Sequence, residues 1–94
     1  MSVYVDTIVV YPNAWGPFKK GSCHLVADTL DELHAFAEKL GMRRAWFQDT
    51  KHMPHYDLTP KRREEALRLG AVSISTMELA RRRRAARLAQ GSTG

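Results

Sequence analysis

The stretch KHMPHYDL, residues 51–58, gathers two histidines, a tyrosine and an aspartate around one proline. His55 and Asp57 are separated by one residue, so their side chains point the same way in an extended segment. An imidazole beside a carboxylate suits a divalent metal, or a general base whose tautomer the carboxylate fixes. The alternative is that Asp57 caps the next helix while His55 packs on it. We predict that the HYD half belongs to a catalytic site and that the KHMP half is a flexible approach to it.

Four further polar residues lie in or beside apolar segments. Asp6 interrupts VYVDTIVV, where burying a carboxylate is costly unless it is paired, although a strand end or an edge strand would also accommodate it. His24 occupies one face of the segment 22–27, and Asp28 follows it, as a site residue or as a stabiliser of the next helix's first turn. His34 borders that helix's apolar stripe, as a boundary residue or as a catalytic one. We assign Asp6, His24 and Asp28 as metal ligands and His34 as a third catalytic residue.

The elements that must position these residues follow from the apolar periodicity. Strands are predicted at residues 3–10, 22–27, 44–48 and 71–74. Helices are predicted after the capping pairs Thr29–Glu32 and Ser75–Glu78, and after Thr59 with Pro60 at the first helical position. The fold class is therefore α/β, a small single domain over residues 1–80 of order β-β-α-β-α-β-α. Alternating strands and helices predict a three-to-four-stranded, mostly parallel sheet with flanking helices.

A parallel arrangement would bring the polar residues to one place, because ligands bind beyond the carboxyl ends of parallel strands. Asp28 follows the second predicted strand, the HYD residues follow the third, and Ser75 follows the fourth. Around these groups we predict that Trp46, Gln48 and Tyr56 bind substrate, with core packing as the alternative for Trp46. No zinc signature, P-loop, dinucleotide glycine motif or nucleophile elbow is present in the sequence.

The net charge of +5 comes from one end of the chain. Five of the 15 lysines and arginines lie within residues 81–87, and the other ten balance the ten acidic residues. Residues 81–94 are predicted to be a basic helical extension with a disordered tail, either a solvated helix end or an arm that binds nucleic acid through phosphate contacts. The arginines concerned are Arg81, Arg82, Arg83, Arg84 and Arg87.

The cysteine content and the hydropathy of the chain indicate its cellular compartment. Cys23 is the only cysteine, which excludes a disulfide within the chain and favours a reduced, cytoplasmic location with Cys23 buried in its strand. No segment approaches the roughly 20 apolar residues of a membrane span. The N-terminal apolar run lacks a preceding basic region, so we interpret it as a first strand rather than a signal peptide.

Several short strings, taken in order, resemble the family catalogued as domain of unknown function 4031. The strings are YVD at 4–6, HLVAD at 24–28, ELHAFA at 32–37, LG at 40–41, WFQ at 46–48, HYDLT at 55–59 and LGAV at 69–72. The resemblance implies a small stand-alone protein of bacteria or phages and implies no activity. It places in the shared motif Asp6, His24, Asp28, Glu32, His34, Trp46, Gln48, His55, Tyr56 and Asp57. Polar residues dominate this set, which favours a site over packing alone.

Two functions are predicted, and whether the protein is an enzyme stays open between them. The first is a metal-dependent hydrolase of a phosphoester or nucleotide, with zinc, manganese or iron as the ion that mixed imidazole and carboxylate ligands prefer. The second is a non-catalytic module that binds a small polar ligand, a protein or nucleic acid, aided by the arginine tail. A structural protein whose histidines and aspartates only cap and pack is a third alternative. Homo-oligomer formation stays open.

Overall fold

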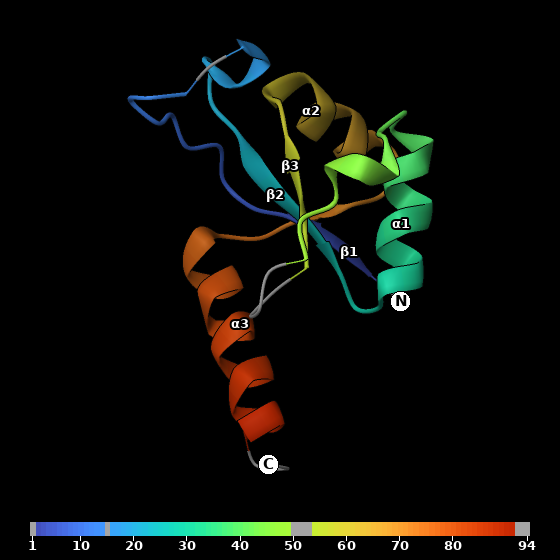
Figure 1. Cartoon of the computed structure of the whole chain (residues 1–94), viewed down its shortest axis with the longest axis vertical. Helices are drawn as coiled ribbons and strands as arrows, with labels where there is room; N and C mark the ends of the chain where they lie inside the picture. Colours follow the sequence, from blue (N-terminus) through green and yellow to red (C-terminus); the bar gives the residue numbers. More distant parts are fainter. Residues whose placement is uncertain (1, 15, 50–53, 92–94) are drawn as a thin grey trace.

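The computed structural model describes residues 2–14, 16–49 and 54–91 (Figure 1). The predicted flexible approach at residues 51–53 and the end of the predicted disordered tail at 92–94 lie outside these ranges. Four strands form one sheet: β1 (Val3–Val5), β2 (Cys23–Ala27), β3 (Tyr56–Leu58) and β4 (Val72–Ser73). Their order in the sheet is β3-β2-β1-β4, so β1 and β2 are the central strands.

The sheet is mixed, and the prediction of a mostly parallel sheet is not confirmed. β2 runs antiparallel to both β1 and β3, and the parallel pair is β1 with β4. The predicted strand at 44–48 was wrong, because Arg44–Trp46 forms a 3-10 helix, η2. All three η2 side chains are exposed, so this segment has no apolar face to pack on a helix layer. The third strand is instead Tyr56–Leu58, where two buried side chains alternate with a half-buried one.

Three α-helices follow the strands: α1 (Leu30–Lys39), α2 (Pro60–Arg68) and α3 (Thr76–Gly91). The predicted caps are confirmed for all three helices: the Thr29 and Thr59 hydroxyls each accept a hydrogen bond from the backbone three residues on. The Ser75 hydroxyl accepts from the Glu78 backbone in the same way at 3.0 Å. These caps satisfy N–H groups that have no partner inside the helix.

The main core lies between one face of the sheet and the helices α1 and α2. The core-facing strand residues alternate along each strand, and they pack against the apolar faces of the two helices. The cluster includes Val5, Cys23, Leu25, Tyr56 and Leu58 from the strands and Leu33, Phe36, Ala37 and Ala66 from the helices. Cys23 is 2% exposed, which confirms the prediction that it is buried in its strand, and burial raises the pKa of its thiol to about 12.

Helix α3 lies on the other side of the sheet and points away from the rest of the molecule (Figure 1). The Arg82 guanidinium sits 4.4 Å from the centre of the Tyr4 ring, and Tyr4 alternates with the core-facing Val3 and Val5. Val26 and Leu79 are also buried yet belong to no part of the main core cluster. Within the described ranges, no helix combines the length and apolar character needed to cross a membrane.

Candidate metal centre and groove

Three polar side chains form a row across the sheet on the face opposite the main core. His24 on β2 pairs directly with Asp57 on β3. On its other side, the Asp6 backbone N–H donates to the His24 carbonyl at 3.4 Å, which extends the pairing of β1 and β2 by one residue. Because side chains alternate along a strand, Asp6, His24 and Asp57 all avoid the face that carries Cys23 and Leu25. The register thus aligns residues that are far apart in the sequence.

Asp6 holds His24 with two hydrogen bonds. Its carboxylate is 2% exposed, and Oδ1 accepts from the His24 backbone N–H at 2.6 Å. Oδ2 lies 2.9 Å from His24 Nδ1. A carboxylate only accepts hydrogen bonds, so Nδ1 carries the proton of the ring and Nε2 keeps its lone pair. This is the arrangement that orients metal-binding histidines in many proteins, with a carboxylate behind the ring and the second nitrogen facing the ion.

His24, His55 and Asp57 form a cluster in front of that pair. The two imidazole rings meet edge to face with centroids 4.9 Å apart, and His55 Nε2 lies 3.5 Å from Asp57 Oδ1. One ligand atom from each of the three residues lies within 4.8 Å of the other two. The hydrogen bond with His55 and another from the Gln48 side chain lower the pKa of Asp57, against the opposing effect of burial. Asp57 is therefore an anion at neutral pH.

This donor set fits a divalent metal. Two imidazoles and one carboxylate are the ligands of zinc, iron and manganese, and three protein ligands leave coordination positions for water or substrate. Zinc holds nitrogen and oxygen ligands at roughly 2.0–2.2 Å, so the donor atoms, which lie within 4.8 Å of one another, would have to move closer together to bind one ion. The Gln48 amide holds Asp57 Oδ2, which leaves Oδ1 directed toward the histidines.

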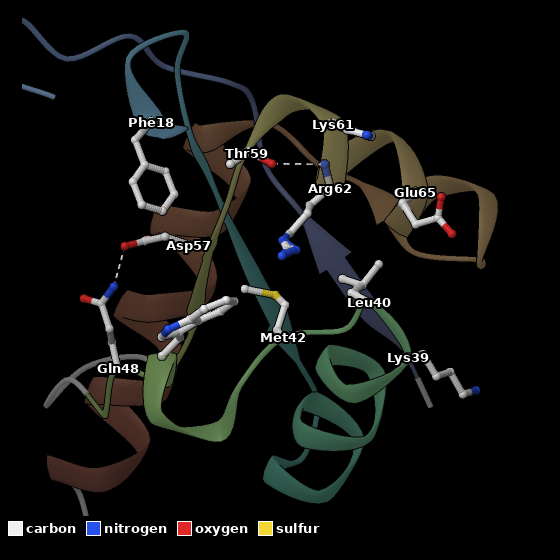
Figure 2. Close-up of a pocket in the computed structure, with 11 residues that line it drawn as sticks. Phe18, Lys39, Leu40, Met42, Gln48, Asp57, Thr59, Lys61, Arg62 and Glu65 are labelled. Carbon is white, nitrogen blue, oxygen red and sulfur yellow. Dashed lines mark hydrogen bonds between the residues drawn. The ribbon is translucent and has the colours of Figure 1, made fainter. Parts of the chain in front are cut away.

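A groove of about 1040 Å³ opens beside the cluster (Figure 2). Asp57 and Gln48 lie on one side of it, and Lys39 and Leu40 lie on the other. Trp46 lines the groove from η2, with the Arg62 guanidinium 5.5 Å from the centre of its ring. The remaining lining residues are Phe18, Met42, Thr59, Lys61 and Glu65. The groove thus combines aromatic, aliphatic and cationic side chains next to the candidate metal centre.

The structure places Asp28 away from this cluster. Strand β2 runs from His24 toward Asp28, so the two residues lie at opposite ends of the strand. The Asp28 carboxylate accepts a hydrogen bond from the Ser2 backbone at 3.0 Å, and the Asp28 N–H donates to the Ser2 carbonyl at 3.1 Å. Asp28 thereby fastens the start of β1 to the end of β2.

His34 and Tyr56 also lie apart from the cluster, on the core face. His34 Nδ1 lies 2.8 Å from the Tyr56 hydroxyl, and the His34 ring meets Phe47 edge to face at 4.6 Å. Burial, aided by the charge of Arg44, lowers the pKa of His34. Burial likewise raises the pKa of the Tyr56 hydroxyl. The pair is a neutral hydrogen-bonded contact between α1 and β3.

The arginines of α3 have partners within the helix and on the sheet. Arg81 and Arg82 lie 3.5 Å and 3.4 Å from the Glu78 carboxylate, and Arg82 also contacts Tyr4. Arg84 is exposed, while the side chains of Arg83 and Arg87 lie outside the part that the structure describes.

Sequence reasoning missed Arg63, which braces the site from α2. Its Nε donates to the Asp6 carbonyl at 2.8 Å, and its Nη2 donates to the Ser73 hydroxyl at 3.0 Å. Arg63 therefore ties α2 to β1 and β4 beside the Asp6–His24 pair. Nothing in the local sequence distinguishes Arg63 from Lys61 and Arg62, because the partners of Arg63 are distant along the chain.

Comparison with known proteins gives a family for this chain. Residues 3–86 match the family described as Protein of unknown function (DUF4031), and the chain belongs to that family. No curated protein and no solved structure shows a significant match to it.

Proposed function

We propose that this protein is a metal-dependent hydrolase of phosphate esters, with a divalent ion held by His24, His55 and Asp57. The observation that carries the proposal is the convergence of these three donors, within 4.8 Å of one another, in front of the buried Asp6 that orients His24. Structural histidines do not need a buried carboxylate behind the ring, whereas metal-binding histidines commonly have one.

The residues have distinct parts in such a reaction. A divalent ion held by His24, His55 and Asp57 would supply a Lewis acid and would activate a water for attack. Asp6 keeps the His24 ring in the tautomer that presents Nε2, and Gln48 holds Asp57 in place. In the hydrolysis, the water oxygen forms a bond to phosphorus, the bond from phosphorus to the ester oxygen breaks, and the proton of the water ends on the leaving oxygen.

Charge around the groove supports a phosphate ester as the substrate. Lys39, Lys61 and Arg62 line it, and no described carboxylate forms an ion pair with any of them. Glu65 also lines the groove, but its carboxylate is bound by Arg68 at 2.6 Å. The Arg62 side chain points into the groove and can meet an anionic ligand there, while Lys39 and Lys61 extend outward and add positive charge at its rim (Figure 2).

Elemental analysis of the untagged protein, with thermal shifts on adding zinc, manganese or magnesium, tests the proposal. We expect about one equivalent of ion in the wild type and none in His55→Ala or Asp57→Ala. Asp28→Ala removes a carboxylate at the other end of β2 and should keep the ion. Activity is then assayed on p-nitrophenyl phosphate and on bis(p-nitrophenyl) phosphate. A wild type that neither holds an ion nor shifts on adding one would overturn the proposal.

Binding of nucleic acid through α3 is a second candidate function, favoured by the continuation of the helix through the arginine run to Gly91. A helical arm presents its arginines together along a phosphate backbone, and each phosphate contact steepens the dependence of affinity on salt. Deleting residues 81–94 should abolish binding to a short DNA duplex while leaving metal content unchanged. Equal duplex affinity with and without these residues would contradict this role.

A further inference from the structure

The groove beside the candidate metal centre has the composition of a nucleotide site. Its lining pairs an aromatic surface, Trp46 and Phe18, with the cations Lys61 and Arg62. Its volume of about 1040 Å³ compares with roughly 300–1,000 Å³ for small-molecule sites, which is ample for one nucleotide. Alkyl phosphates would need the cations but would gain little from the aromatic side chains.

Trp46 is placed as a stacking surface and not as a core residue. Its side chain is 45% exposed although tryptophan is large and apolar. The Arg62 guanidinium lies over one face of the ring, 5.5 Å from its centre, so a base would stack on the other face or take the place of Arg62. A planar base gains stacking energy on such a face whatever its sequence identity, and Arg adds a cation–π contribution.

The end of β3 and the start of α2 bring Asp57 and two cations to the same groove as this aromatic surface. Asp57 lies on β3, Thr59 caps α2, and Lys61 and Arg62 occupy the first turn of that helix. All four line the same groove (Figure 2). A phosphate near the start of α2 would therefore lie beside Lys61 and Arg62, in the groove that Asp57 also lines, whereas His24 and His55 do not line it. The positive end of the helix dipole also favours an anion there.

We infer that the groove binds a nucleotide, with the base stacked on Trp46 and the phosphate at the start of α2, near Lys61 and Arg62 and with its ester directed toward Asp57. This inference rests on the proposed function for the orientation of the phosphate, and it adds the class of substrate. The nucleotide is either free or the terminal residue of a strand, because the stacking surface and the cations contact a single nucleotide unit.

Calorimetric titration of the zinc-loaded protein with adenosine 5′-monophosphate and with ribose 5-phosphate tests the inference. The two probes share the sugar phosphate and differ only in the base. Stacking of one base corresponds to roughly 5- to 150-fold in affinity, so we expect the nucleotide to bind at least about 5-fold more tightly. Trp46→Leu should reduce the affinity for the nucleotide to that for ribose 5-phosphate. The affinity for ribose 5-phosphate should not change. A four-nucleotide single strand, titrated in parallel, distinguishes a free nucleotide from a strand end.

Lys61→Ala should weaken the binding of both probes by the same factor. Lys20 is exposed and lies outside the groove, so Lys20→Ala should change the affinity for neither probe. Far-UV circular dichroism and the melting temperature establish that each variant is folded, and Trp46→Phe gives a conservative variant that retains part of the stacking. Equal affinity of the wild type for the two probes would overturn the inference while leaving the hydrolase proposal intact. Base-dependent binding in a protein that holds no metal would support the groove and overturn the hydrolase instead.

Discussion

At the residue scale, the buried carboxylate of Asp6 decides which nitrogen of His24 faces the cluster. Both of its oxygens receive hydrogen bonds from His24, at 2.6 Å and 2.9 Å, and Arg63 binds its backbone carbonyl. A carboxylate buried to this degree is tolerated only with such partners. Asp6 therefore fixes the position of His24 through two hydrogen bonds.

Replacing Asp6 with asparagine should favour the opposite tautomer of the His24 ring. The Asn amide oxygen still accepts from the His24 backbone, but its NH₂ group donates toward Nδ1 and favours the ring tautomer with a proton on Nε2. We expect metal affinity to fall about 10- to 100-fold, as for the loss of other groups that orient metal ligands. Competition with a chromophoric zinc chelator measures it. Asp28→Asn is the matched control, and equal affinities of the two variants would refute the assignment.

The contact between His34 and Tyr56 predicts a pH dependence of stability. The pKa of His34 is lowered in the folded state, so the unfolded chain takes up the proton more readily below its ordinary value of 6.5. Stability is therefore complete above that value and falls as the pH decreases through it. Arg44 strengthens this effect and Asp31 opposes it.

Urea unfolding at pH 7.5 and pH 5.5 checks this expectation. The wild type should lose more stability on acidification than His34→Gln, which keeps a polar side chain at the position and does not titrate. The other histidines contribute equally to both proteins, so the difference between the two slopes isolates His34. Parallel slopes would show that protonation of His34 is not linked to unfolding.

At the element scale, the loop between β1 and β2 depends on Gly21. After β1 ends at Val5, Val9 forms an antiparallel bridge with Ser22, the residue before β2. Gly21 precedes this bridge with φ +117, a conformation that L side chains rarely adopt. A Cβ there would lie 2.5 Å from Ile8 Cγ2. The turn therefore requires glycine both for its backbone angle and for the close approach of Ile8.

We expect Gly21→Ala to destabilise the protein by about 1–3 kcal/mol, combining backbone strain with the displacement of Ile8. Gly16→Ala is the control, because its φ is also positive but no atom lies within 4 Å of the added Cβ. Thermal unfolding of both variants measures the difference. If Gly21→Ala costs no more than Gly16→Ala, the close approach contributes nothing to stability.

At the scale of the whole molecule, helices cover both faces of a four-stranded sheet unequally. α1 and α2 enclose the main core, whereas α3 contacts the opposite face near its N-terminal end. Leu79 is 4% exposed, so the beginning of α3 is part of the packed structure. The predicted boundary at residue 80 falls inside this helix and stays a prediction.

Leu79→Ala measures how firmly α3 is attached. Removing a buried leucine side chain typically costs at least about 2 kcal/mol, and we expect a loss of that size. Met77 lies two residues earlier with 75% of its side chain exposed, and Met77→Ala should change stability by less than about 0.5 kcal/mol. Denaturant unfolding distinguishes the two. A negligible loss for both variants would mean that α3 is an independent extension.

Features that depend on neighbouring residues were predictable from the sequence. The caps at Thr29 and Thr59, the burial of Cys23 and the alternation along β2 are all as predicted, because hydrogen bonds and side-chain direction within one element are local. The sequence also showed that the polar HYD residues, 55–57, lie just before the helix cap at Thr59. The family membership agrees with the resemblance carried by the short strings.

Only the tertiary structure decided which polar residues meet. Asp6 and His24 are 18 residues apart, and only the antiparallel register of β1 and β2 brings them together, while the same register carries Asp28 to the far end. β3 pairs antiparallel with β2, and Gln48 pairs antiparallel with His55, neither of which periodicity encodes. The sequence by itself therefore determined the three helices, the strands β1, β2 and β4 and the residue types of the site, but not β3. The fold determined their grouping, because strand partners are selected by packing across the whole sheet.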